Sequence, residues 1–437
     1  MIRVLYLAAA LVLAMAAPAA AHNVTAGADL RIAQTIAGAE VTVVVKGTTR
    51  VPGPLRIGVI AYQPVSALPI GIEVHSVEDG HTTTGTAQAA ANPQYTQLQV
   101  ERTGPHELKL RTGNETAVIP FRVLVERESA GDLLIYGGLF VAALLLVGGL
   151  LTRAPARPGT AMALAAGAAA GVTVAAMVIV FAPHVPAPPP DGAAPTPTTS
   201  TAQGRPYAQV RMDTVPARPA AGEEFTLRVD LIDGSTGRPV DDLTAHHEAL
   251  AHVIVTSEDG RYFRHVHPLR TAPGHLEVRL SADRPGRYLA HAELEREDSG
   301  GQLLAADFTV GGTAKTSQKA DTVTRSGQTG APATQVGATV TPRLQPAVPV
   351  AGRPTTIELD APAGIRAWLG MTGHLLIRSQ NGEFFGHVHE MGAPGSRVRF
   401  TFGFPEPGRY LAWIQYATAD RIVTVPFTVN VTASETQ

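Results

Sequence analysis

Cysteine is absent from this chain of 437 residues. The absence excludes a disulfide framework, a thiolate nucleophile, cysteine-ligated zinc or iron–sulfur sites and the blue-copper centre. Charged residues are also scarce, at 16% of the chain, and the formal net charge is only −2. This balance does not favour binding to nucleic acid. The fifteen histidines therefore carry most of the metal chemistry that the sequence offers.

Aromatic residues make up only 5% of the chain, whereas glycine and proline number 43 and 34. This composition favours β structure with many turns and linkers over helical bundles. We find no Gly-x-Ser-x-Gly elbow, no phosphate-binding glycine loop and no His-Glu-x-x-His motif. The sequence therefore predicts a binding protein and not an enzyme.

Residues 1–21 are typical of a secretory signal peptide, with Arg3 before an apolar run and small residues before the cleavage site. An uncleaved anchor helix is the alternative interpretation. Cleavage after Ala21 makes His22 the first mature residue. Its terminal amine and imidazole together form a chelate suited to Cu(II), although a solvated terminus is the simpler interpretation.

Residues 133–151 and 161–182 are uncharged and apolar, and each stretch is long enough to cross a hydrocarbon core of about 30 Å as a helix. Gly167 and Gly171 have the spacing that close helix packing requires. Between the two stretches the only charges are Arg153 and Arg157, which predict a cytoplasmic loop. The chain is thus expected in the plasma membrane as a multi-pass protein, with its other parts outside the cytoplasm.

The rest of the chain alternates between short apolar stretches and turn residues, as β-sandwiches do, and strands are expected over residues 251–257 and 275–281, among others. The predicted fold is all-β, with three extracytoplasmic sandwiches of immunoglobulin-like or cupredoxin-like type and a two-helix transmembrane hairpin. The sandwiches are expected at residues 22–128, 206–312 and 338–432. A proline-rich linker over 183–205 precedes the second, and a flexible linker over 313–337 precedes the third.

The second and third sandwiches are predicted to be copies of one domain. Residues 252–267 match residues 374–389 without a gap, and seven of the sixteen positions are identical. The same offset of 122 places Gly286–Ala290 on Gly408–Ala412. A match at constant offset over this distance indicates an internal duplication.

Each copy contains three histidines with metal-ligand spacing. His265 and His267 lie on one face of a strand because side chains alternate, and their Cα atoms are about 6.5–7 Å apart. A turn at residues 257–260 is expected to bring His252 back beside them. In the second copy the set is His374, His387 and His389. Three imidazoles on a rigid β framework suit copper or zinc.

Methionines flank only the second of these sets. Met371 and Met391 are thioethers, which favour Cu(I), and the first copy has Ala249 and Leu269 at the same places. His246 and His247 lie near the first set as further candidate ligands.

Two other interpretations of the histidines remain open. They could form a packed, hydrogen-bonded structural cluster, or a cluster that senses pH, because imidazole titrates near neutrality. The duplication favours metal binding. Nine of sixteen positions differ between the copies, yet all three histidines are kept in both.

The segment from His252 to Pro268 resembles a group of bacterial, often actinobacterial, secreted or membrane-anchored proteins with YtkA-like, copper-handling immunoglobulin-like domains. The second copy departs from the pattern, since Glu390 stands in place of the proline. The resemblance implies extracytoplasmic β-sandwiches and heavy-metal handling. The expected function is copper storage, delivery or resistance at the cell envelope, with an envelope protein as a candidate partner. The alternatives are a metal-free structural or interaction module and an envelope pH sensor.

Topology can be tested by cysteine labelling, since the natural chain has no thiol. The positive charge between the apolar stretches predicts that a cysteine replacing Ala156 resists impermeant thiol reagents in intact cells. A cysteine replacing Ser200 should react. The reverse labelling pattern would contradict the proposed orientation.

Overall fold

The structure, a computed structural model, describes residues 27–63, 68–127, 130–152, 157–181, 184, 189–194, 207–297, 299–312, 341–390 and 397–434. His22, Arg153, Met391, the signal peptide and the linker over 313–337 lie outside the described residues. The chain divides into two compact units. One holds the two helices and the other holds the β structure, residues 29–47, 51–123 and 195–437.

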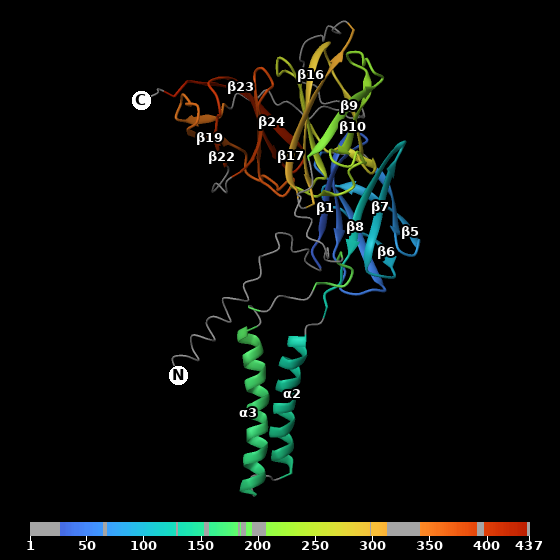
Figure 1. Ribbon diagram of the computed structural model, residues 1–437, viewed down its shortest axis with the longest axis vertical. Helices are drawn as coiled ribbons and strands as arrows, with labels where there is room; N and C mark the ends of the chain where they lie inside the picture. Colours follow the sequence, from blue (N-terminus) through green and yellow to red (C-terminus); the bar gives the residue numbers. More distant parts are fainter. Residues whose placement is uncertain are drawn as a thin grey trace. The chain divides into compact units, whose positions relative to one another are not determined.

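The helical unit contains α2 (Ala130–Leu151) and α3 (Pro158–Phe181), which lie side by side (Figure 1). Both are long and apolar enough to cross a membrane. The small residues permit a close approach, since a Cβ on Gly171 would lie 2.5 Å from the carbonyl oxygen of Gly138. The packing role predicted for Gly171 is therefore confirmed.

The first sandwich is built on two sheets joined by a short parallel pairing of β3 with β5. One apolar core of mainly valine, isoleucine and leucine side chains lies between them. Its strands are β1 (Leu30–Ile36), β2 (Ala39–Lys46), β3 (Gly53–Ala61), β4 (Pro69–Ser76), β5 (Thr82–Ala90), β6 (Thr96–Val100), β7 (Gly104–Thr112) and β8 (Glu115–Val123).

The second sandwich has one sheet in the order β14-β15-β10-β9 and another in the order β11-β16-β12-β13, with β17 beside β16. The strands expected over 251–257 and 275–281 are confirmed at those bounds. The strands are β9 (Ala208–Val215), β10 (Glu224–Asp233), β11 (Leu243–Thr244), β12 (Ala251–Ser257), β13 (Phe263–Val266), β14 (Leu269–Ala272), β15 (His275–Ser281), β16 (Gly286–Arg296) and β17 (Gly300–Val310).

The third sandwich repeats this plan with sheets in the orders β18-β19-β22 and β21-β20-β23-β24. The strands that correspond to β12, β13 and β16 are β20, β21 and β23. Its strands are β18 (Arg343–Gln345), β19 (Pro354–Asp360), β20 (His374–Ser379), β21 (Phe385–His389), β22 (Arg397–Gly403), β23 (Gly408–Ala417) and β24 (Ile422–Val431).

Strand β12 is buried on both faces, unlike an ordinary strand of a two-layer sandwich. Val253 and Val255 point into the core of the second sandwich. On the other face, Ile254 joins a separate apolar cluster with Leu376 and Trp413 of the third sandwich. The two duplicated sheets therefore pack face to face, with apolar side chains from both between them.

The contacts across this face are reciprocal. Phe263 stacks on Trp413 with ring centroids 4.8 Å apart, and Phe385 stacks on His291 at 4.6 Å. The offset of 122 exchanges the two pairs. Such mutual pairing is the signature of an isologous interface, formed here between two halves of one chain.

The face-to-face packing predicts a large effect of truncating Leu411, which is 7% exposed and belongs to the shared cluster. Leu411→Ala should lower the free energy of unfolding by about 2–5 kcal/mol, as in other cores. Leu303→Ala, at a residue 47% exposed, should change it by about 0.5 kcal/mol or less. Urea unfolding of the metal-free protein provides the comparison. Equal effects would contradict the interface.

Candidate metal centre

The two histidine triads lie on the faces that meet at this interface. The hairpin of β12 and β13 pairs Val253 with Val266, which places His252 opposite His267. In the hairpin of β20 and β21, His374 pairs directly with His389. Opposite residues of an antiparallel pair share one face of the sheet. The hairpin geometry predicted from the sequence is therefore present in both copies.

In the first triad (His252, His265 and His267), three ring nitrogens converge. Nδ1 of His252 lies 3.1 Å from Nε2 of His265 and 3.0 Å from Nε2 of His267. The exposed fractions of the three residues are 1%, 8% and 1%. The arrangement offers one ligand atom per ring, all within 4.8 Å of one another.

The second triad (His374, His387 and His389) repeats this arrangement. Nδ1 of His374 lies 3.2 Å from Nε2 of His387. The ligand atoms of all three rings again lie within 4.8 Å of one another. Nε2 of His389 is buried and has no hydrogen-bond partner in the part of the chain that the structure describes. An unsatisfied buried nitrogen beside two converging ones suits a metal ligand.

Hydrogen bonds on the outer side of the rings fix where the protons of the first triad lie. Nε2 of His252 donates to the carbonyl oxygen of His246 at 3.1 Å, and Nδ1 of His267 donates to the Glu40 carboxylate at 2.5 Å. Nδ1 of His265 donates to Oε1 of Gln415 at 2.9 Å. A neutral imidazole has one N–H, so each inward nitrogen carries a lone pair.

The second triad is held in the same way. Nε2 of His374 donates to the carbonyl oxygen of Trp368 at 3.1 Å, and Nδ1 of His387 donates to the Glu293 carboxylate at 2.6 Å. Carbonyl and carboxylate oxygens only accept. When both rings are neutral, two lone pairs therefore face each other at 3.2 Å between them.

Burial disfavours the proton that would otherwise relieve this repulsion. Desolvation, and then the neighbouring imidazoles, hold the pKa values of His252 and His265 well below the ordinary histidine value. Burial and His387 do the same to the pKa of His374. Burial also lowers the pKa of His389 to about 3. These four histidines therefore favour the neutral, electron-donating form at physiological pH.

The outer partners come from different sandwiches. Glu40 lies on β2 of the first sandwich, Glu293 on β16 of the second and Gln415 on β23 of the third. Glu293 and Gln415 correspond at the offset of 122. Each accepts a hydrogen bond from a histidine of the other copy, Glu293 from His387 and Gln415 from His265. Sequence reasoning missed all three residues. Only the shared offset could have indicated that Glu293 and Gln415 have one role.

The two triads are neighbours. Ring centroids of His265 and His387 lie 5.3 Å apart, and those of His252 and His387 lie 5.4 Å apart. Trp368 packs beside the rings of both triads, 5.4 Å from His265 and 5.1 Å from His374. The sequence predicted two separate sites, whereas the fold brings all six imidazoles into one cluster.

The remaining candidates have different surroundings. His246 and His247 were expected to serve the first triad, but the side chain of His246 pairs with Glu295, and His247 lies against His389 of the second triad. The backbone of Met371 pairs with Trp368. Met391 and His22 lie outside the described residues, so the thioether and terminal-chelate hypotheses stay predictions.

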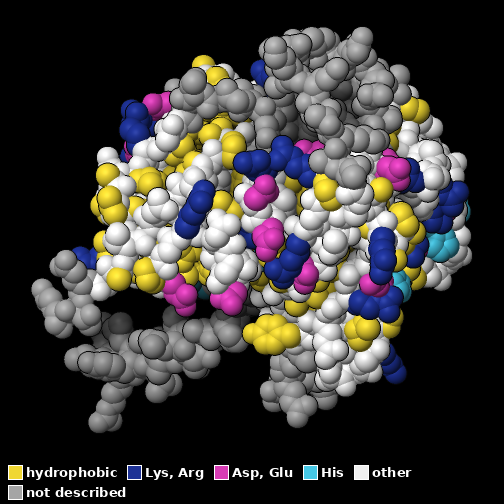
Figure 2. Space-filling model, turned by 90° about the horizontal axis from the view of Figure 1, so that it is seen from above, with side chains coloured by type: hydrophobic (Ala, Val, Ile, Leu, Met, Phe, Trp, Pro, Cys, Tyr) yellow, Lys and Arg dark blue, Asp and Glu magenta, His cyan; other side chains and the backbone are white. Residues whose placement is uncertain are grey.

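The cluster lies inside the protein. On the face drawn in Figure 2, only small areas of histidine reach the surface, among interspersed basic and acidic side chains. His275, in contrast, is exposed and pairs with Asp230 at 2.7 Å. The buried triads therefore differ sharply from the surface histidines of the same chain.

One family model matches part of the chain, and its description gives no function. A family model described as a domain of unknown function, DUF8832, matches residues 205–315 and 334–433, which is just under half of the chain. It matches once on each of the two copies. No curated protein matches the chain.

Solved structures match only weakly. One is "Crystal structure of chicken CNTN1 FN1-FN3 domains", at 7% identity and a TM-score of 0.18, covering 88% of this chain and 97% of that chain. Another is "Crystal structure of tetra-tandem repeat in extending region of large adhesion protein", at 7% identity and a TM-score of 0.15, with coverages of 92% and 74%. Likeness at this level says nothing about what the chain does.

Acid should destabilise the metal-free protein because the buried histidines have lowered pKa values. The unfolded chain takes up protons below a pH of about 6.5, whereas burial and Arg378 lower the pKa of His291 to about 4 in the folded state. Stability is therefore lost as the pH falls from about 6.5 towards 4, by about 1.4 kcal/mol per pH unit for each such group. His291→Gln should reduce this slope, and His81→Gln, at an exposed residue, should not. Urea unfolding at several pH values measures both.

Proposed function

We propose that the chain is a membrane-anchored, extracytoplasmic copper-binding protein that stores copper, delivers it or confers resistance to it. The observation that carries the proposal is the pair of opposed lone pairs in each triad, at 3.0 Å between His252 and His267 and 3.2 Å between His374 and His387. A packed structural cluster would place an N–H between such nitrogens. When the rings are neutral, the outer acceptors take those protons, and the inward lone pairs are free to bind a cation at the centre.

The donor set supports a transition metal and favours copper. Every inward ligand is an imidazole nitrogen, whereas magnesium and calcium require oxygen ligands. Among divalent ions the affinity of nitrogen sites peaks at copper. Zinc is the alternative ion, since imidazole also suits it.

The charges around the triads support the binding of cations. The carboxylates of Glu40 and Glu293 contact the outer nitrogens of one histidine in each triad. Their side chains are 9% and 22% exposed. These two carboxylates offset part of the positive charge of two bound copper ions, which lowers the cost of burying them.

The closed geometry favours binding over catalysis. A catalytic metal keeps one coordination position open for water or substrate. The first triad is instead covered by Trp368, which is itself 1% exposed. The resemblance of residues 252–268 to copper-handling envelope domains and the two long apolar helices support a place at the membrane.

Metal titration of the full chain in detergent tests the proposal. The wild type should bind two copper ions per chain, and the His265→Ala and His387→Ala variants one each. Affinity at the altered triad should fall by more than about 100-fold, because loss of outer partners alone costs 10–100-fold. His275→Ala should behave as wild type. Copper should raise the melting temperature of the wild type most.

The outcome that would contradict copper binding is equally definite. If His265→Ala loses much of its metal-free stability and the wild type shows no metal-dependent shift, the triads are structural. If metal does bind, elemental analysis of the protein purified from its own membrane identifies the ion. Zinc in place of copper would overturn the choice of metal.

A further inference from the structure

We propose that the two triads form one paired and unequal copper centre. His247 of the second sandwich is the fourth ligand of the His374–His387–His389 site. Trp368 of the third sandwich closes the other site as a three-imidazole site. This inference rests on the proposed copper binding and extends it to residues outside the triads.

The inequality originates in two equivalent loops. Each loop is closed by an isolated β-bridge, His246 with Ala249 in the second sandwich and Trp368 with Met371 in the third. The offset of 122 relates the two bridges residue by residue. In each loop the first residue offers its carbonyl oxygen to the triad of its own sandwich. The side chains then differ, because Trp368 corresponds to His246 and Leu369 to His247.

The ring of His247 lies beside the second site. Its ring lies 3.7 Å, centroid to centroid, from that of His389. Nε2 of His389 is buried without a hydrogen-bond partner among the described residues. The side chain of His246 pairs instead with Glu295, at 2.7 Å. Of the two histidines in this loop, His247 is therefore the one that can complete the second site.

The backbone of the loop is strained in a way that fixes this placement. His247 and Glu248 have φ values of 45° and 60°, in the left-handed region that non-glycine residues rarely adopt. Glu248 pairs with Arg31 at 2.5 Å, and its carbonyl oxygen accepts from the backbone N–H of Ala33. Strain of this kind persists only where neighbouring structure enforces it, and it clusters at functional sites. Leu369, at the equivalent position of the other loop, has a φ of 55°, so both loops share this backbone and differ in the side chain that it presents.

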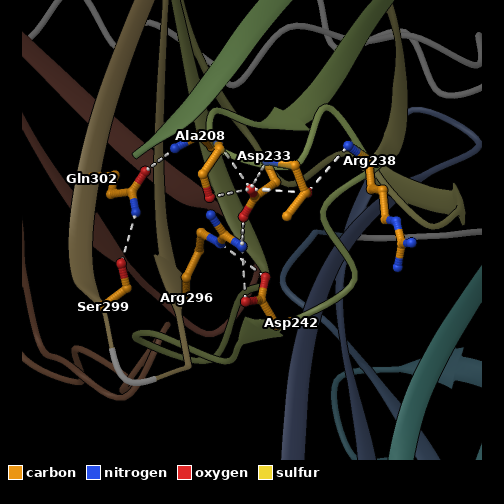
Figure 3. Close-up of polar contacts among 9 residues, drawn as sticks. Ala208, Asp233, Arg238, Asp242, Arg296, Ser299 and Gln302 are labelled. Atoms are coloured by element: carbon orange, nitrogen blue, oxygen red, sulfur yellow. Dashed lines mark hydrogen bonds and ion pairs between the residues drawn. The ribbon is translucent and has the colours of Figure 1, made fainter. Parts of the chain in front are cut away.

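A buried ion cluster anchors the other end of the loop (Figure 3). The guanidinium of Arg296, 4% exposed, donates to Asp242 at 2.8 Å and to Asp233 at 2.8 Å. Leu243 and Thr244 then pair with β16. The segment leading to His247 is thus held at both ends, as a preorganised ligand requires.

The first site has no equivalent fourth ligand. Leu369 replaces His247 in the loop, and it is fully buried in an apolar cluster with Trp368. The Trp368 ring lies 5.4 Å from His265 and 6.1 Å from His267. His247 and His389, in contrast, are partly exposed. Copper in the second site should therefore exchange faster with solvent than copper in the first.

The test uses the full chain in detergent, with one site removed at a time. In a His265→Ala background only the second site remains, and adding His247→Ala should weaken its copper affinity at least tenfold. It should also remove one nitrogen from the Cu(II) electron paramagnetic resonance pattern. In a His387→Ala background only the first site remains, and His247→Ala should change nothing. Leu369→Ala is the matched control in the first background.

Pairing and access are measured on the same proteins. The doubly loaded Cu(II) wild type should show dipolar broadening that both single-site backgrounds lose. Trp368→Ala should speed copper extraction by a chelator more at the first site, which has no other cover, than at the second. Spectra without dipolar broadening, or an unchanged copper affinity of the second site in the His247→Ala variant, would overturn this inference. The proposal that the chain binds copper would still hold. If neither site binds copper, the proposed function itself fails.

Discussion

The face-to-face packing of two duplicated sheets is the constraint on which the rest of the molecule depends. Without it, each triad would lie on the outer face of a sandwich, exposed to water and free to protonate. Phe263 on Trp413 and Phe385 on His291 exclude water from that face. Burial consequently disfavours the charged form of His252, His265 and His374.

The outer hydrogen bonds turn this buried cluster into a defined centre. Gln415 holds His265, Glu293 holds His387, and Glu40 of the first sandwich holds His267. Such partners fix the tautomer and orientation of a ligating histidine. Because they come from three sandwiches, metal binding and the assembly of the three are thermodynamically linked, so an ion that fills the triads should also stabilise their contacts.

Duplication followed by divergence explains both the likeness and the inequality of the two triads. Positions that point into the cluster keep histidine in both copies, whereas the covering loops carry His246 and His247 in one copy and Trp368 and Leu369 in the other. A symmetric pair would bind two ions alike. The differing loops provide one partly exposed site and one sealed site within a single interface.

The sequence alone determined the elements that follow from local periodicity. The alternation of apolar and polar residues predicted β12 and β15 at their observed bounds, and the length of the two apolar stretches predicted α2 and α3. The turn at residues 257–260 predicted the hairpin that places His252 opposite His267. It also revealed the duplication and the six candidate ligands. Only the tertiary structure decided that the two triads meet, that Glu40, Glu293 and Gln415 contact their outer nitrogens, and that His247 lies against His389 of the other copy. Those contacts join residues 94 to 227 positions apart, and no local pattern records which faces of two sandwiches will pack together.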